Sequence, residues 1–158
     1  MNNNELMVDF LQKYIKIESV FPYPHYDETT DLLIQQAILD GFKIQKIGLA
    51  SGFPALIITF EGSEPSLPSL VLNHHMDVVP AEYTPEWVAP PFAGEIREGM
   101  MIGRGTQDMK GVGVLHYFAL KSLKDSGMQP QRTIHLIAVP DEERGGGGGM
   151  KLLIETEE

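Results

Sequence analysis

Three acidic residues stand in a row in the stretch PDEERGG, residues 140–146. Asp141, Glu142 and Glu143 follow an apolar run that ends at Val139. Neighbouring carboxylates repel one another and are costly to hold near a core unless positive charge compensates them. Either Arg144 supplies that charge, as in an exposed acidic turn, or the carboxylates hold a metal cation. The two glutamates are adjacent and follow a strand, so their side chains are expected to diverge, and one could bind a metal while the other faces a water molecule.

A histidine and an aspartate lie two positions apart in NHHMDVVP, residues 73–80. In an extended chain His75 and Asp77 point to the same side. The carboxylate could then hydrogen-bond one imidazole nitrogen and leave the other free to bind a metal. His74, which would face the opposite way, is the competing ligand, and a surface histidine pair at the end of a strand is the simpler alternative.

A third acidic residue, Asp108, lies in GRGTQDMKGVG, residues 103–113, directly before a predicted helix. Aspartate is a preferred N-cap, so capping explains this position as simply as metal binding does. The stretch does not match the dinucleotide-binding pattern G-x-G-x-x-G, because Asp108 occupies the place of the third glycine. Gly111 and Gly113 would let the helix pack closely against neighbouring backbone.

The elements that must position these residues alternate between helix and strand. Apolar spacing predicts helices over residues 4–19, 30–39, 109–124 and from 149, and strands over 42–49, 55–60, 69–74 and 133–139. Residues 80–99 are rich in proline and predict an irregular segment, and the five glycines 145–149 predict a loosened entry to the last helix. The alternation favours a single α/β domain over residues 1–158. Ligand sites in such sheets gather at the carboxyl ends of strands, so the three stretches are expected to converge.

Composition excludes several classes of function. A net charge of −10 argues against a nucleic-acid-binding protein, which needs basic surface for phosphates. The chain has no cysteine, so disulfides, thiolate ligands and cysteine nucleophiles are excluded, and a metal would need His, Asp or Glu. No apolar run approaches the roughly 20 residues that span a bilayer, and the N-terminus lacks a basic signal region. We therefore expect no membrane partner and a cytoplasmic location.

Together the three stretches resemble the M20 family of co-catalytic zinc peptidases, and within it the aminoacylases. The resemblance runs from about Leu6 to the C-terminus. It is densest in LVLNHHMDVVPAEYTPEW, IGRGTQDMKG and RTIHLIAVPDEERGG. It implies the three-layer α/β zinc-peptidase fold, a sheet flanked by helices, of which this chain would form the incomplete N-terminal part of the catalytic domain.

The resemblance assigns a role to each acidic or histidine position in the three motifs. His75 resembles a ligand of the first zinc ion, and Asp77 the carboxylate that orients it. Asp108 resembles the aspartate that bridges both ions, with a peptide bond after it that is often cis in the family. Glu142 resembles the general base and Glu143 a ligand of the second ion.

The implied reaction is hydrolysis of the amide bond of an N-acyl-L-amino acid or a peptide, with two Zn²⁺ ions per complete site and a glutamate that moves the proton. A dipeptidase or deacetylase specificity in the same family is the nearest alternative. The implied parent protein is a homodimer through a lid domain. His25, His116 and His135 are assigned structural or surface roles.

Family members are more than twice this length, so the lid domain and the remaining zinc ligands are expected to lie outside these 158 residues. Three ligands cannot complete two zinc sites that each take about four. We therefore expect the isolated chain to hydrolyse little or nothing. The alternative from another class is a catalytically silent protein that binds a partner through its unpaired sheet edge.

Overall fold

The computed structural model describes residues 3–156, which form four α-helices, one 3₁₀ helix and six strands. The elements are α1 (Asn3–Lys16), α2 (Tyr26–Leu39), β1 (Lys43–Gly48), β2 (Pro54–Phe60), β3 (Leu70–His75), β4 (Glu95–Arg97), β5 (Met100–Ile102), α3 (Lys110–Asp125), β6 (Ile134–Val139), η1 (Glu142–Arg144) and α4 (Met150–Glu155). This succession confirms the predicted α/β class, because the helices and the sheet share one core.

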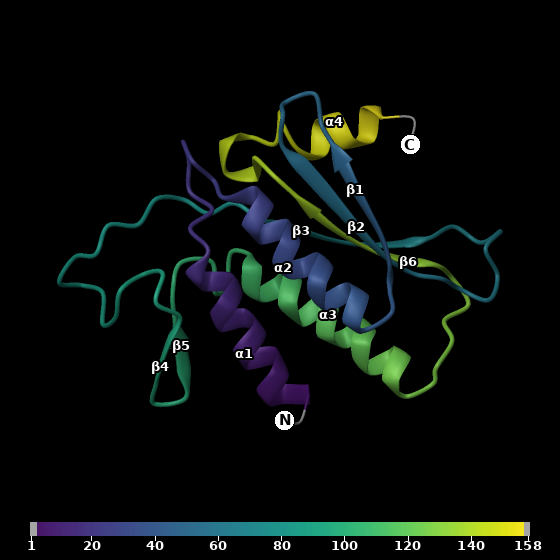
Figure 1. Cartoon of the computed structure of the whole chain (residues 1–158), viewed down its shortest axis with the longest axis horizontal. Helices are drawn as coiled ribbons and strands as arrows, with labels where there is room; N and C mark the ends of the chain where they lie inside the picture. The colour runs from purple at the N-terminus through teal and green to yellow at the C-terminus, as the bar shows by residue number, and fades with distance from the viewer. Residues whose placement is uncertain (1–2, 157–158) are drawn as a thin grey trace.

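The main sheet has the strand order β1-β2-β6-β3 (Figure 1). Strand β3 runs parallel to β6, whereas β1–β2 and β2–β6 are antiparallel. In the parallel pair His75 lies opposite Val139, the last residue of β6. The chain segments that follow β3 and β6 therefore leave the sheet side by side at the same edge, which brings two of the three sequence motifs together.

One face of the sheet packs against α1, α2 and α3, which lie in front of it in Figure 1. Successive residues of a strand point to opposite faces, and Leu56, Ile58, Leu136 and Ala138 all point to this one. Each is at most 2% exposed. Full burial of one such leucine or isoleucine contributes about 1.5–3 kcal/mol, so this layer dominates the stability of the fold.

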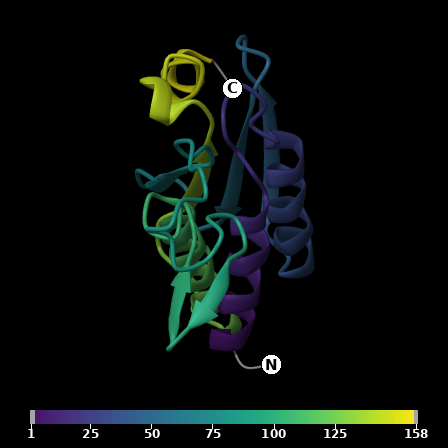
Figure 2. The same cartoon turned by 90° about the vertical axis from the view of Figure 1, so that its left-hand side faces the viewer.

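The opposite face carries a smaller core under α4. Ala55, Val139 and Leu153 are buried there, and Ile57 and Ile137 are only partly covered. Figure 2 shows α2 and α4 on opposite sides of the strands β1 and β2. Helices thus lie on both faces, as predicted for a three-layer fold, but within residues 3–156 the second helical layer consists of α4 alone.

The prediction of an irregular segment over residues 80–99 missed a hairpin. Strands β4 and β5 pair antiparallel and project from the helical side of the molecule (Figure 1). Their turn, Glu98-Gly99, has positive φ at both positions (50° and 78°), as a two-residue hairpin turn requires. Strands of three residues show too little alternation to be recognised, and glutamate is an uncommon residue at positive φ.

Among the described residues, no helix is long and apolar enough to cross a membrane.

Candidate metal centre

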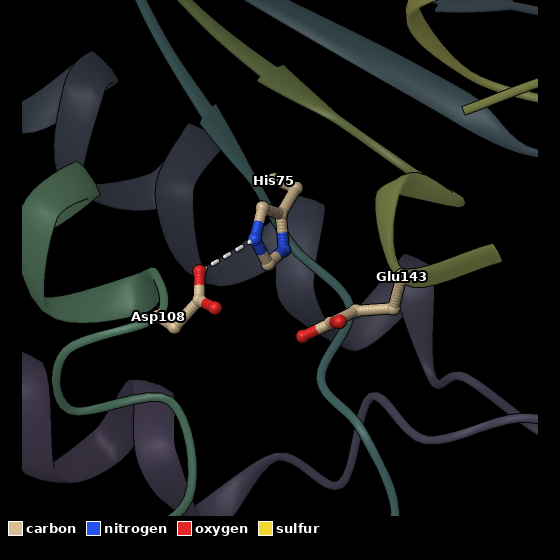
Figure 3. Close-up of side chains that lie close together, drawn as sticks. All are labelled: His75, Asp108 and Glu143. Carbon is tan, nitrogen blue, oxygen red and sulfur yellow. Dashed lines mark hydrogen bonds and ion pairs between the residues drawn. The ribbon is translucent and has the colours of Figure 1, made fainter. Parts of the chain in front are cut away.

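The three motifs meet where β3 and β6 end. His75 is the last residue of β3, Asp108 stands just before α3, and Glu143 lies in η1, which follows β6. One ligand atom of each residue lies within 4.8 Å of the corresponding atoms of the other two. Figure 3 shows the two carboxylates directed toward the space beside the imidazole ring. The structure therefore brings together the three residues that sequence analysis nominated as metal ligands.

His75 is held in one orientation by a backbone contact. Its ring is 3% exposed, and Nδ1 lies 2.8 Å from the carbonyl oxygen of Asp77. A carbonyl only accepts hydrogen bonds, so Nδ1 carries the proton and Nε2 faces the cluster. Nε2 is 3.0 Å from Oδ1 of Asp108. A nitrogen lone pair and a carboxylate oxygen meet at this distance only with a cation, either a proton or a metal ion, on or between them.

Asp77 binds a different partner from the one its spacing predicts. The chain leaves the strand conformation after His75, and the fully buried carboxylate of Asp77 turns toward η1. There Oδ1 accepts the N–H of Glu142 at 3.2 Å, and Oδ2 accepts the N–H of Glu143 at 3.0 Å. Its distance from Nδ1 of His75 is 3.8 Å. The backbone carbonyl makes the predicted bond to the imidazole, while the carboxylate fixes the two glutamates.

The position of Asp108 does not reflect helix capping. The N-cap of α3 is Met109, and the peptide bond between these two residues is cis. The Asp108 side chain is 79% exposed and bonds to His75. A Cβ on Gly111 would lie 1.9 Å from the carbonyl oxygen of Thr106, so glycine at this position allows the loop before Asp108 to rest on the first turn of α3. This confirms the close packing predicted from the glycines.

Both glutamates reach the same cluster. They lie in a 3₁₀ turn, not in a strand. The alternation of strand side chains, from which their divergence was predicted, therefore does not apply to them. Oε2 of Glu142 is 3.6 Å from Nε2 of His75, and Glu143 completes the group with Asp108. Glu142 is not part of that three-residue group, so the two carboxylates approach the imidazole from different positions.

Arg144 does not neutralise the glutamates. Its guanidinium lies 4.3 Å from the centre of the Phe21 ring and 4.0 Å from Oδ1 of Asp141. Burial raises the pKa of Glu143, and the carboxylates of Asp108, Asp77 and Glu142 raise it further, against the lowering effect of His75. The alternative of glutamates paired with Arg144 therefore does not describe this site, and among the described residues His75 is the basic side chain that contacts Asp108 and Glu142.

The glycine run anchors the turn that carries the glutamates. Asp141, at φ 66°, donates its N–H to the hydroxyl of Tyr26, and its Oδ2 accepts the N–H of Gly148 at 2.7 Å. A Cβ on Gly149 would lie 1.8 Å from the carbonyl oxygen of Pro140. The run thus forms a hydrogen-bonded turn, and the loosened helix entry predicted from its composition stays a prediction.

The remaining histidines lie elsewhere. His74 faces away from His75, as the strand alternation predicts, and contacts Tyr14. Burial is the main cause that lowers its pKa to about 3, so the ring is neutral. The group of His75, Asp108 and Glu143 also does not include His25, His116 or His135.

The donor set fits a divalent metal ion. One imidazole and two carboxylates are donors that zinc accepts, and two atoms sharing a tetrahedral zinc ion lie roughly 3.4 Å apart. The 3.0 Å between Nε2 of His75 and Oδ1 of Asp108 is close to that separation. Carboxylate-rich sets also bind other divalent ions, so the donors indicate a cation site before they indicate a particular metal.

Comparison with known proteins agrees with this geometry. The sequence profile of Peptidase family M20/M25/M40 matches residues 71–158, which contain the whole cluster. Aminoacylase-1 of Mus musculus is 40% identical over 152 residues, which are 96% of this chain and 37% of that protein. The chain therefore spans little more than a third of the length of this relative.

Solved structures share the fold at lower identity. Human carnosine dipeptidase 1 superposes with a TM-score of 0.78 at 22% identity, over 96% of this chain and 35% of that one. The M20 family metallo-carboxypeptidase Sso-CP2 from Sulfolobus solfataricus gives 0.77 at 24% identity, over 92% and 32%. With the profile match covering more than half of its residues, the chain belongs to peptidase family M20/M25/M40.

Proposed function

We propose that this chain supplies part of the active site of a zinc-dependent amidohydrolase that cleaves N-acyl-L-amino acids to a carboxylate and a free amino acid. The observation that carries the proposal is the group of His75, Asp108 and Glu143, with Glu142 beside it and Arg144 directed to Phe21 instead of to the glutamates. Similarity to aminoacylase-1 supports the substrate class.

In this proposal His75, Asp108 and Glu143 hold the metal, and Asp77 positions them. The metal, when bound, polarises the amide carbonyl and makes a water molecule more acidic. The backbone carbonyl of Asp77 keeps Nε2 of His75 directed at the cluster. Its carboxylate keeps both η1 glutamates in place through their N–H groups.

Glu142 is proposed as the group that moves the proton. Its carboxylate is 57% exposed and lies 3.6 Å from Nε2 of His75, next to the three donors but outside their group. An exposed carboxylate in that position can take a proton from an attacking water molecule and deliver it to the departing amide nitrogen. The two adjacent glutamates thereby serve two different purposes.

The substrate class rests on sequence rather than fold. Aminoacylase-1 is 40% identical, whereas human carnosine dipeptidase 1 is 22% identical and therefore supports the shared fold alone. A dipeptidase or a deacetylase would use the same donors, so substrate comparison has to distinguish them. Because the described residues bring three donors together, the chain by itself is expected to bind zinc weakly and to hydrolyse little.

Calorimetric titration of the purified chain with Zn²⁺ tests the metal part of this proposal. His75→Ala and Glu143→Gln are expected to weaken binding at least about tenfold, since each removes a donor. Glu142→Gln, the matched change at the neighbouring position, is expected to leave affinity within a factor of about three. Equal affinity for all four proteins would contradict the assignment of donors.

Hydrolysis is tested in a longer protein that contains this chain. N-acetyl-L-methionine, a dipeptide and an N-acetylated diamino acid are compared as substrates, with and without a chelator. Chelator-sensitive preference for the first substrate, lost in Glu142→Gln, is expected. Preference for the dipeptide would move the function to the peptidase alternative, and turnover that survives the chelator would refute the proposed chemistry.

A further inference from the structure

The C-terminal end of α1 touches the strand that carries His75. Tyr14 is fully buried, and its hydroxyl lies 3.2 Å from Nε2 of His74, with the two rings meeting at 88°. His74 and His75 are consecutive in β3 and point to opposite faces of the sheet. The contact on one face therefore fixes the backbone from which the imidazole of the cluster projects on the other.

The same residue of α1 holds the segment that carries Asp108. Lys110, two positions later, is fully buried, and its Nζ donates to the carbonyl oxygens of Tyr14 at 3.1 Å and Ile17 at 2.7 Å. Nζ also lies 4.9 Å from the centre of the Tyr14 ring. Carbonyls at a helix C-terminus lack intrahelical partners and form its negative end, so they are suited to accept hydrogen bonds from a buried amino group.

Two further contacts close the arrangement. The hydroxyl of Ser19 donates to the carbonyl of Met76 at 2.6 Å, and the N–H of Val78 donates to the carbonyl of Ser19 at 3.0 Å, so both neighbours of Asp77 are tied to the chain that follows α1. A Cβ on Gly113 would lie 2.3 Å from the His74 ring, so α3 rests directly on that ring.

We propose that Tyr14 is a positioning residue for the metal centre, which sets the separation of His75 and Asp108 through its hydroxyl contact with His74 and its carbonyl contact with Lys110. The inference rests on the proposed metal-binding function. Its physical basis is that donor groups must be held within about 0.5 Å of their productive positions, which requires packing and hydrogen bonds behind them. Tyr14 is the one described residue that bonds to the segments behind both donors.

Tyr14→Phe removes only the hydroxyl and keeps the ring. Tyr117→Phe is the matched control, because Tyr117 is also fully buried and its hydroxyl also makes one hydrogen bond, to Asp40 at 2.6 Å. A merely structural role for Tyr14 predicts that both variants lose stability and that neither changes metal binding. A positioning role predicts that only Tyr14→Phe affects the metal centre.

Lys110→Met tests the second contact, between the Tyr14 carbonyl and Lys110. Lys124→Met is its control, because Nζ of Lys124 likewise donates to a backbone carbonyl, that of Gly41 at 2.9 Å, and lies 5.4 Å from the centre of the Phe42 ring. This second pair keeps the inference testable if Tyr14→Phe fails to fold.

The measurements are Co²⁺ titration with visible absorption spectroscopy and NMR of the histidine ring nitrogens in the metal-free chain. Tyr14→Phe and Lys110→Met are expected to weaken Co²⁺ binding about tenfold, to change the absorption bands and to shift the His75 nitrogen resonances. The two controls are expected to match the wild type in all three readouts.

If the wild type binds Co²⁺ and Tyr14→Phe binds it equally with unchanged bands, the inference fails and the proposed function stands. If the wild type does not bind, the proposed function fails, and the metal-free His75 resonances alone decide whether Tyr14 positions the ring.

Discussion

Replacing Asp77 by asparagine tests how the two glutamates of the cluster are held. The Asp77 carboxylate is fully buried, and its two oxygens accept the N–H groups of Glu142 and Glu143. Asparagine has nearly the same shape but offers only one acceptor oxygen. Its NH₂ group would face the other N–H, so one of the two hydrogen bonds is lost and one donor is left without a partner.

The expected loss follows from these two bonds. A hydrogen bond to a charged group contributes about 1.5–3 kcal/mol. Removing the charge of Asp77 also relieves its repulsion with Glu143, which offsets part of the loss. We therefore expect the free energy of unfolding to fall by about 2 kcal/mol, which for a chain of this size lowers the melting temperature by roughly 4–8 °C. Zinc affinity is expected to fall about 10- to 100-fold, as for other residues that orient metal ligands.

Urea unfolding followed by circular dichroism measures the first effect, and calorimetric zinc titration measures the second. Asp27→Asn is the matched control, because the Asp27 side chain is 90% exposed and pairs with Lys46 at the surface. That variant is expected to change stability by less than about 0.5 kcal/mol. An Asp77→Asn protein that unfolds and binds zinc like the control would refute the reasoning.

Gly149→Ala is expected to destabilise the chain by several kcal/mol, because the added Cβ meets the backbone of Pro140. Gly147→Ala is the control and is expected to be neutral or slightly stabilising, because its added Cβ has no atom within 4 Å. Thermal unfolding of both variants tests the glycine turn. Burial raises the pKa of Asp40, but hydrogen bonds from Tyr117 and two other side chains lower it below its usual value of 3.8. Its stabilising contribution is therefore present above pH 3.8 and lost as the pH falls through the lower folded value. Asp40→Asn should lower stability by about 2 kcal/mol at pH 7, and the difference from wild type should shrink below pH 4 in urea titrations.

Much of the fold could be predicted because its elements have strong local patterns. The apolar run that became β6 and the helical spacing over α3 were placed within a residue or two of their observed bounds. The convergence of the three motifs also followed from a local rule, since ligand sites gather where strands end. The parallel pairing of β3 with β6 then places His75 beside the chain that leads to the glutamates.

The contacts that hold the site could not be predicted in the same way. The pattern around Tyr14 is that of any core aromatic on an amphipathic helix, and nothing near it in sequence indicates His74 or Lys110. A buried lysine runs against the usual preference of that residue for the surface. The i, i+2 rule predicts a bond between the Asp77 carboxylate and the imidazole, but the rule holds only within a strand, and β3 ends at His75.

The charge balance of the cluster gives the strongest physical reason for a cation there. Within the described residues, Arg144 lies over Phe21, and the amino group of Lys110 is bonded to the carbonyls of Tyr14 and Ile17. The charged form of His75 is the one positive group that contacts the carboxylates, and its Nε2 already meets two of them. A fold that keeps several carboxylates together without neutralising them loses stability by doing so. Sites that retain such a cost are typically functional, and a divalent cation is what would compensate this one.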